Sequence, residues 1–193
     1  NLEMEDALRK KGKDKLAEQI ASIGDMANFI YVRQKGDPPG NARPVLNAAH
    51  IIGDEPFLFF FADDFFTGAK SVADQLLEVY YEKGASVVAL REVDPDSVSS
   101  YGIASVSDRN GKVVKINTLV EKPSKEDAPS NLAIASGYLL TPDVMPILEK
   151  EKIGVGGEIL ISDAVDELAQ SQDVYGVVVE GTYHDTGNPE VYL

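Results

Sequence analysis

The stretch Phe57-Leu58-Phe59-Phe60-Phe61-Ala62-Asp63-Asp64 joins six apolar residues directly to two acids. A continuously apolar run of this length predicts a strand that is covered on both faces, as in an α/β sheet. Ligands of such sheets bind at the carboxyl ends of the strands, so this strand would carry Asp63 to the functional edge. The stretch therefore indicates both the fold class and the place of a site.

Apolar runs of strand length alternate with a helical pattern beyond this stretch. Residues 72–80 carry apolar side chains at helical spacing, and Gly84 follows as an end signal. The alternation predicts an α/β fold with a doubly wound, mostly parallel, Rossmann-like sheet and helices on both faces. A mixed sheet is expected because Asp108-Arg109-Asn110-Gly111 predicts a hairpin within residues 102–119. The predicted strands are residues 28–32, 57–62, 86–91 and 174–179.

The N-terminal residues have a charged helical pattern that begins at once, without an initial Met. Apolar side chains fall on one face of this pattern, and Gly24 is placed to end a helix over residues 2–23. The longest linker-like patch is the Pro/Gly-rich segment 37–40. We therefore expect residues 1–193 to form a single domain.

Composition limits the kinds of partner that this chain can have. Its 18 basic and 32 acidic residues give a formal charge of −14, and such a surface repels nucleic acid and anionic membranes. A phosphate ligand must therefore be held by a local group of donors or by a metal. The absence of Cys excludes disulfides and thiolate sites and suits a reducing compartment, so we expect a cytoplasmic location. The sequence contains no run of about 18 apolar residues, which a membrane-spanning helix would need.

Asp63 and Asp185 are the candidate metal ligands. Each comes shortly after a predicted strand, so both are expected at the same edge of the sheet. Two carboxylates that converge there can hold one Mg²⁺, whose coordination is commonly completed by water and substrate phosphates. The alternative for each residue is a helix cap or a turn position.

Glu121-Lys122-Pro123 follows the second strand of the predicted hairpin. The Glu can accept hydrogen bonds from sugar hydroxyls, and the Lys supplies a compact positive charge for a phosphate. The Pro ends the strand ladder and stiffens the turn. Gly102 and Gly137 are positions where the backbone can approach a ligand closely. The alternatives are a solvated charged turn and, for Gly137, a strand bulge.

The order of short motifs along the chain resembles that of the bacterial-type glucose-1-phosphate uridylyltransferases. The motifs are Val32-Arg33-Gln34, the strand that ends in Asp63, Tyr101-Gly102, Glu121-Lys122-Pro123, Ser130-Asn131-Leu132-Ala133, Gly157-Glu158-Ile159 and Asp185-Thr186-Gly187-Asn188. Each motif is short, but their order and spacing cover nearly the whole chain. The resemblance implies a nucleotidyltransferase fold and the condensation of UTP with glucose 1-phosphate to UDP-glucose and pyrophosphate.

The resemblance also implies roles for the candidate residues. Asp63 and Asp185 would bind Mg²⁺, and Glu121 would bind the glucose hydroxyls. Lys122 would bind the sugar phosphate, and Gly102 would contact the hexose through its backbone. The residue type alone gives Gly137 the same predicted contact with the hexose. The implied reaction is in-line attack of the sugar-phosphate oxygen on the α-phosphorus of UTP, with Lys122 and Asp63 as catalytic residues. Positioning and charge neutralisation carry such a reaction, so it needs no protein nucleophile.

By the same resemblance, Gln34 and Gly40 would face the uracil. Family members usually have Gly-x-Gly-His-Ala in this loop, whereas this chain has Gly40-Asn41-Ala42-Arg43-Pro44. The family also opens with a Gly-rich loop of the Gly-x-Gly-Thr-Arg type, whose backbone N–H groups bind the triphosphate. Residues 1–193 contain no such loop. We therefore expect an N-terminally truncated, C-terminal sugar-phosphate-binding portion that is inactive by itself.

Two other functions are compatible with these departures. A non-catalytic domain that binds sugar nucleotides, or a regulatory domain, would agree with the lack of a Gly-rich loop. The same enzyme class with another nucleotide or sugar would agree with the altered loop at Gly40. The resemblance further implies self-association, for which the helix over residues 2–23 offers a surface, and its alternative is that this helix packs on its own domain.

Overall fold

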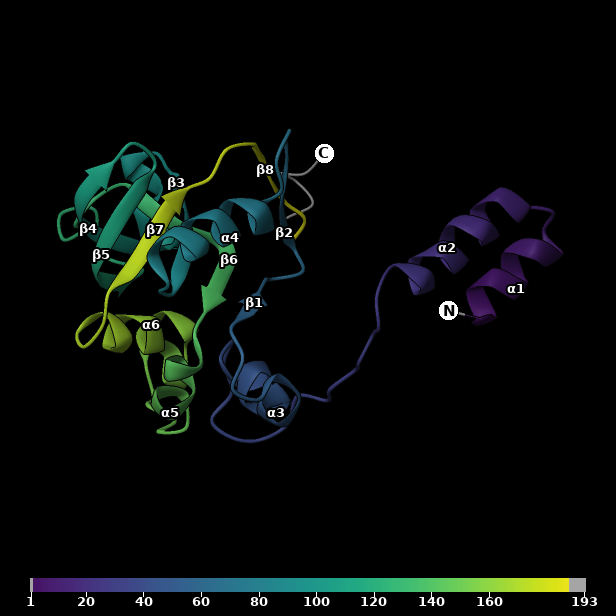
Figure 1. Ribbon diagram of the computed structural model, residues 1–193, viewed down its shortest axis with the longest axis horizontal. Coiled ribbons are helices and arrows are strands. Elements are labelled where there is room, and N and C mark those ends of the chain that lie inside the picture. The colour runs from purple at the N-terminus through teal and green to yellow at the C-terminus, as the bar shows by residue number, and fades with distance from the viewer. Residues whose placement is uncertain (1, 188–193) are drawn as a thin grey trace. The chain divides into compact units, whose positions relative to one another are not determined.

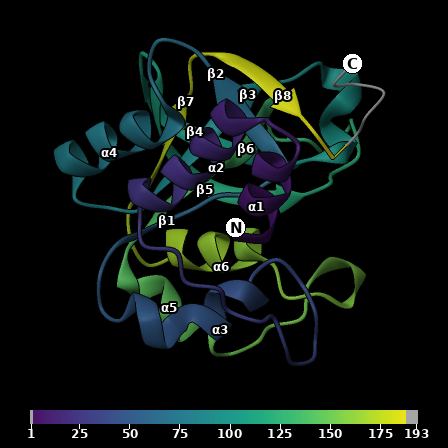
Figure 2. The same ribbon diagram turned by 90° about the vertical axis from the view of Figure 1, so that its right-hand side faces the viewer.

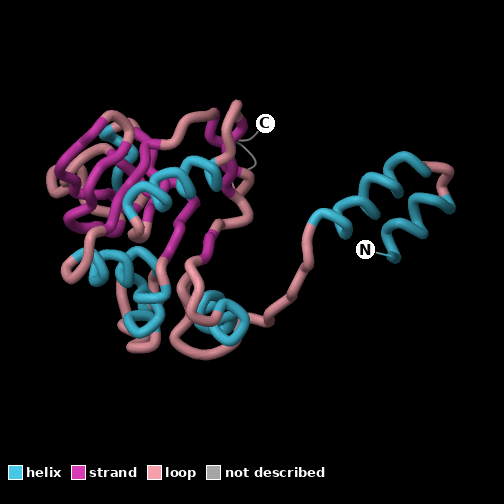
Figure 3. The backbone as a smooth tube through the Cα atoms, viewed as in Figure 1, coloured by secondary structure: helices cyan, strands magenta, loops and turns pink. Residues whose placement is uncertain are grey.

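The structure is a computed structural model that describes residues 2–187, apart from the side chain of Ser136. It forms two compact units, Asn1–Arg33 and Gln34–Leu193. Residues 28–32, which were predicted as a strand, lie in a loop, because none of the described strands pairs with them (Figure 3). Asn188 of the C-terminal motif lies outside the described residues.

The first unit is a pair of helices, α1 (Leu2–Lys10) and α2 (Asp14–Met26), that pack on each other. The predicted single helix over residues 2–23 is wrong, because Gly12 has a φ of +66° and ends α1. The backbone N–H groups of Gly12 and of the next residue donate to the preceding turn at 2.9 and 3.0 Å, a common way to close a helix C-terminus. Gly24 lies inside α2 instead of ending it.

The second unit is a layered α/β structure (Figure 1). Its helices are α3 (Arg43–Ile52), α4 (Val72–Lys83), α5 (Met145–Leu148) and α6 (Ile161–Ala169). Short 3-10 helices span Pro95–Ser100, Pro142–Val144 and Val155–Gly157. Its strands are β1 (Phe57–Phe59), β2 (Asp64–Thr67), β3 (Val87–Glu92), β4 (Gly102–Asn110), β5 (Val113–Glu121), β6 (Leu132–Leu140), β7 (Val174–Val178) and β8 (Thr182–Asp185).

The main sheet has the strand order β1-β6-β3-β7-β5-β4. Among the described strands, β3 and β7 are parallel neighbours, and every other adjacent pair is antiparallel. The predicted mixed sheet is confirmed, but the expectation of mostly parallel neighbours is corrected. The reasons are β6, which lies between β1 and β3 and runs antiparallel to both, and β5, which runs antiparallel to both β7 and β4. The strands β1 and β3, which are separated in the chain by β2 and α4, therefore point the same way, as the alternation predicted. They are not neighbours in the sheet.

Helices cover both faces of this sheet, as predicted for a doubly wound fold (Figures 1 and 2). On one face, Leu76 of α4 belongs to the same apolar core cluster as Val87 and Ala89. On the other face, Val88 and Leu90 share a cluster with residues of α3, α5 and α6. Successive residues of β3 thus point to different helix layers, as the alternation of side chains along a strand requires.

Several predicted elements agree with the structure to within one residue. These are β3, β7 and α4, which ends at Gly84 with a left-handed φ of +65°. The predicted hairpin of β4 and β5 is confirmed as well, and β5 extends two residues beyond the predicted end. The predicted strand 57–62 is only partly right, because β1 has three residues and the chain then enters β2. β2 pairs with β8 in a separate two-stranded ribbon. Leu58 is 38% exposed, so β1 is not covered on both faces.

Candidate functional site

A cavity of about 150 Å³ opens where β4 begins and β5 ends. The predicted residues Gly102 and Glu121 line it and are paired in the register of these two strands. Its lining also includes Asn41, Phe61, Asp64, Ser100, Tyr101, Ile134, Tyr138 and Ser162. Carboxylates, hydroxyls and aromatic rings around one small cavity suit a sugar-sized polar ligand.

The carboxylate of Glu121 is held at one side of this cavity. Ser162, which is buried in the first turn of α6, donates a hydrogen bond of 3.1 Å to Glu121 Oε2. A methyl group at Gly102 would lie 3.1 Å from the same oxygen and 2.7 Å from Ile134 Cδ1. Gly102 therefore provides the space beside Glu121. Because an ionised carboxylate has about four acceptor positions, Glu121 keeps acceptor capacity toward a ligand.

Lys122 lies just beyond the cavity, exposed, where β5 ends. Its φ of +47° is uncommon for a residue with a Cβ, and its backbone N–H donates to the Tyr101 carbonyl at 3.0 Å. Within residues 2–187, no carboxylate forms an ion pair with its ammonium group. The positive charge is therefore available to a phosphate at the edge of the cavity.

Asp63 and Asp185 are brought together by the β2–β8 ribbon. Thr186 donates to the Asp63 carbonyl from both its N–H and its hydroxyl, each at 2.8 Å. Gly187 N–H donates to Asp185 Oδ1 at 2.9 Å, and a methyl group on Gly187 would lie 3.1 Å from Asp63 Oδ2 and 3.2 Å from Asp185 Oδ1. The two carboxylates thus converge on one point.

This pair of acids has the oxygen ligands that Mg²⁺ prefers. In the part of the chain that the structure describes, no group of three His, Cys, Asp or Glu side chains is arranged to hold a metal ion. The pair therefore fits a metal whose other positions are taken by water and substrate phosphates, rather than a site made by the protein alone.

A third acid, Asp64, lies next to the acid pair and also lines the cavity. It follows Asp63 in the chain, lines the cavity, and accepts a hydrogen bond of 2.7 Å from the Tyr183 hydroxyl. Burial raises the pKa of Asp64, the bond from Tyr183 lowers it, and the charges of Asp63 and Asp185 raise it further. Burial also raises the pKa of Tyr183, so its hydroxyl stays protonated and remains a donor. The ribbon concentrates negative charge, which a bound cation would relieve.

The loop around Gly40 is bound to the segment that precedes α6. Asn41 Oδ1 accepts a hydrogen bond of 2.8 Å from the Ile161 N–H. Gly40 has a φ of +137°, and a methyl group there would lie 2.1 Å from the Ile159 carbonyl oxygen. Gly40 therefore permits a close approach between two backbone segments. Gln34 is exposed at the start of the second unit and does not line the cavity, so the roles of both residues toward a base stay predictions.

Gly137 is not among the residues that line the cavity. It lies in β6 on the face opposite to Tyr138, and a methyl group there would lie 3.0 Å from Phe60 Cε1 and 3.2 Å from Val72 Cγ1. The lack of a side chain lets these residues pack closely against the strand. Its predicted contact with the hexose stays a prediction.

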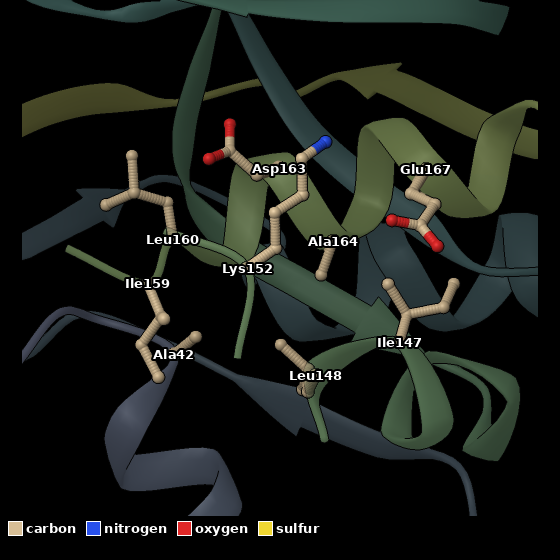
Figure 4. A pocket seen from close by; sticks show the side chains of 9 residues that line it. All are labelled: Ala42, Ile147, Leu148, Lys152, Ile159, Leu160, Asp163, Ala164 and Glu167. Carbon is tan, nitrogen blue, oxygen red and sulfur yellow. The ribbon is translucent and has the colours of Figure 1, made fainter. Parts of the chain in front are cut away.

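A second cavity lies between the start of α3, α5 and α6 (Figure 4). It holds about 10 Å³, which is room for about one water molecule and too little for a sugar. Lys152 and Asp163 lie beside it; burial raises the pKa of Asp163, and the Lys152 charge opposes this. We assign this cavity to imperfect packing between the three helices.

Sequence reasoning did not identify Asp64, Ser162 or Tyr183 as functional. A signal was present for two of them, since Asp64 directly follows Asp63 and Ser162 lies three residues after the motif Gly157-Glu158-Ile159. No signal marks Tyr183, because its partner Asp64 lies on a strand that is distant in the sequence.

Comparison with known proteins identifies the family. The sequence profile described as nucleotidyl transferase matches residues 5–193. The chain belongs to the nucleotidyl transferase family. A UTP–glucose-1-phosphate uridylyltransferase of Bacillus subtilis is 39% identical to this nucleotidyl transferase chain over 186 residues, which are 96% of the chain and 62% of the relative. A second such enzyme, of Staphylococcus saprophyticus, is 39% identical over 96% of the chain and 64% of its own length.

Solved structures of UDP-glucose pyrophosphorylases are similar to this nucleotidyl transferase chain. A UDP-glucose pyrophosphorylase in complex with UDP-glucose is 36% identical with a TM-score of 0.87, over 94% of this chain and 69% of that one. An apo UDP-glucose pyrophosphorylase is 35% identical with a TM-score of 0.88, over 100% and 71%. The resemblance to the bacterial-type uridylyltransferases and the expected fold are both confirmed.

The nucleotidyl transferase chain spans less than two thirds of the length of the curated relatives named above. Within residues 2–187, none of its helices has the length and apolar character needed to cross a bilayer.

Proposed function

We propose that the protein containing this chain is a UTP:glucose-1-phosphate uridylyltransferase, which forms UDP-glucose and pyrophosphate. The observation that carries the proposal is the cavity lined by Gly102 and Glu121, with the exposed Lys122 following Glu121 where β5 ends. The convergence of Asp63 and Asp185 beside the cavity residue Asp64 supports it. The names of the curated relatives and of the similar solved structures support it independently.

In the proposed reaction, Glu121 accepts hydrogen bonds from the hexose hydroxyls and Lys122 holds the sugar phosphate. A phosphate oxygen of glucose 1-phosphate forms a bond to the α-phosphorus of UTP, and the bond from that phosphorus to the pyrophosphate oxygen breaks. Positioning and charge neutralisation carry the rate, so no side chain acts as a nucleophile. Asp63 and Asp185 would hold Mg²⁺, which when bound neutralises charge on the phosphates.

The remaining roles belong to the same proposal. Gln34 and Gly40 would face the uracil, and the backbone at Gly137 would approach the hexose. Residues 1–193 would act as the sugar-phosphate-binding portion. Small-molecule substrates rather than nucleic acid agree with the net charge of −14, and a cytoplasmic location agrees with the absence of Cys. Self-association through α1 and α2 is supported by their exposed apolar side chains.

The test is formation of UDP-glucose from UTP and glucose 1-phosphate by the full-length protein and two Lys variants. Lys122→Met is expected to raise KM for glucose 1-phosphate about tenfold or more, because a charge-assisted phosphate contact is lost. Lys125→Met is the matched control, since Lys125 is also exposed but is already paired with Asp96. It is expected to change KM less than about twofold.

Other outcomes would favour the alternatives. A full-length protein that binds glucose 1-phosphate without turnover would be a non-catalytic binding domain. Turnover with another nucleoside triphosphate or sugar 1-phosphate, in a panel assayed under the same conditions, would keep the enzyme class and change its substrate.

A further inference from the structure

Arg91, near the end of β3, places its guanidinium between two tyrosine rings. Its Cζ lies 4.6 Å from the ring centroid of Tyr101 and 4.1 Å from that of Tyr183. Tyr101 precedes β4 of the main sheet, whereas Tyr183 lies in β8 of the two-stranded ribbon. A cation is attracted to the face of each ring, so Arg91 joins two sheets that share no strand pairing among the described residues.

Each of these tyrosines also contacts one half of the candidate site, Tyr183 through its side chain and Tyr101 through its backbone. The Tyr183 hydroxyl donates to Asp64 at 2.7 Å, and the strand register places Asp64 opposite Asp185. The Tyr101 carbonyl accepts the hydrogen bond from Lys122 N–H at 3.0 Å, and Tyr101 lines the sugar-sized cavity. A displacement of Tyr183 would therefore move the acids, and a displacement of the Tyr101 backbone would move the sugar-phosphate groups.

Ordinary ion pairing does not explain the position of Arg91. In the described part of the chain, no carboxylate forms an ion pair with it, and its buried Nε donates no hydrogen bond. Its charge lowers the pKa of Asp64, but this is the smallest of the influences on that carboxyl. Arg43 provides the contrast, because it donates to the Pro38 carbonyl from two nitrogens and to Glu151 from the third. A buried donor without a hydrogen bond is unfavourable for stability. The placement of Arg91 is therefore better explained by the site residues that the two tyrosines contact, Asp64 and Lys122.

We propose that Arg91 is a positioning residue that sets the distance between the Asp63/Asp185 pair and the sugar-phosphate groups Glu121 and Lys122. This inference rests on the proposed function. Arg91 contacts the two rings and is not among the residues that line the cavity, so it acts through Tyr101 and Tyr183. Because a misplacement of about 1 Å can slow a positioned reaction about 100-fold, its loss should appear in kcat more than in substrate binding.

Two substitutions of Arg91 in the full-length protein test this. Arg91→Met keeps length and apolar contact but removes the charge, and it is expected to lower kcat about 10- to 100-fold with both KM values changed less than about threefold. Arg91→Lys keeps the charge without the planar group and is expected to recover part of the lost kcat. Arg109→Met is the matched control, because Arg109 is an exposed residue paired with Glu92 rather than with rings.

Hydrogen exchange supplies a readout that does not depend on activity. The amides of β2 and β8 are expected to exchange about tenfold faster in Arg91→Met than in the wild type, and to be unchanged in Arg109→Met. If Arg91→Met does not fold, Arg91→Lys and Tyr183→Phe carry the same comparison. Tyr183→Phe keeps the ring and loses the hydrogen bond to Asp64. Where both variants fold, the kcat of Tyr183→Phe is expected to fall less than that of Arg91→Met.

The outcomes separate this inference from the proposed function. An active wild type with an unchanged kcat in Arg91→Met overturns the positioning role and leaves the proposed function standing. A fall in kcat that is matched by an equal rise in both KM values also overturns it, because the role would then be structural. An inactive wild type overturns the proposed function and with it the catalytic part of the inference. In that case, unchanged exchange of the β2 and β8 amides in Arg91→Met would also overturn the proposed connection between the ribbon and the main sheet through Arg91.

Discussion

Asp64 and Asp185 lie directly opposite each other on the antiparallel strands β2 and β8. Like charges at opposed positions destabilise a strand pair, and Asp63 adds a third carboxylate next to them. A ribbon selected for stability alone would not combine these acids. Their presence is explained if the acids serve a cation and phosphates, since functional sites commonly reduce stability.

Replacing Asp64 with Asn is expected to raise the melting temperature at pH 7 in metal-free buffer. Burial raises the pKa of Asp64 in the folded state, and the bond from Tyr183 only partly opposes this. Protonation therefore favours folding: the stabilisation is fully present below the unfolded pKa near 3.8 and is lost as pH rises through the folded pKa. The advantage of the variant should shrink between pH 7 and pH 3, which thermal unfolding at several pH values would show.

Asp173→Asn serves as the control, because the pKa of Asp173 is shifted in the opposite direction from that of Asp64. A hydrogen bond from Lys115 lowers the pKa of Asp173, so its contribution is present at neutral pH and lost on acidification. This variant should not gain stability at pH 7. A lower melting temperature of Asp64→Asn at pH 7 would contradict the argument.

A divalent cation is expected to stabilise the wild type through the acid pair. Ligand binding to the folded state at ten times its Kd contributes about 1.4 kcal/mol, which corresponds to a rise of roughly 3–5 °C for a domain of this size. Asp63→Asn should abolish the rise with Mg²⁺, while Asp173→Asn should keep it. An equal rise in both variants would mean that the cation acts elsewhere.

Ser162→Ala is expected to weaken binding of glucose 1-phosphate. The change removes the 3.1 Å hydrogen bond that orients Glu121, and losing a bond to a charged group costs about 1.5 kcal/mol, or roughly tenfold in affinity. Steady-state kinetics should show a higher KM for glucose 1-phosphate with KM for UTP unchanged. Ser171→Ala, which removes only a bond to the Leu168 carbonyl, should leave both values as they are. A parallel rise in KM for UTP would argue against a specific role in holding the sugar.

Local chemistry explains what could be predicted from the sequence. The turn residues 108–111 indicate the hairpin, and apolar spacing followed by Gly84 indicates α4. Gly12 shows how a local signal can be missed, since it ends α1 between residues that otherwise continue the helical pattern. Gly40 shows the limit of such signals. A glycine can be recognised as a place of close approach, but whether a ligand or the Ile159 backbone approaches depends on tertiary structure.

Contacts between distant segments account for what the sequence could not predict. The insertion of β6 between β1 and β3 makes two antiparallel pairs where the alternation predicted one parallel pair, and no local pattern encodes that insertion. The pairing of β2 with β8 likewise joins residues more than a hundred positions apart. The pair Asp63 and Asp185 was predicted from its place after two strands and from the resemblance. The hydrogen bonds from Tyr183 to the neighbouring Asp64 and from Ser162 to Glu121 became visible only in the structure.

Gly40→Ala is expected to destabilise the second unit far more than Gly53→Ala. Both glycines have positive φ values, +137° and +62°, but a methyl group at Gly40 would meet the Ile159 carbonyl oxygen at 2.1 Å, whereas nothing lies within 4 Å of one at Gly53. The control should therefore lose only the conformational cost of about 1–2 kcal/mol. The backbone clash should bring the loss at Gly40 to about 4 kcal/mol or more, measured by urea unfolding. Equal losses in the two variants would show that the loop moves away from Ile159 at little cost, and the tie between this loop and the start of α6 would then not constrain the site.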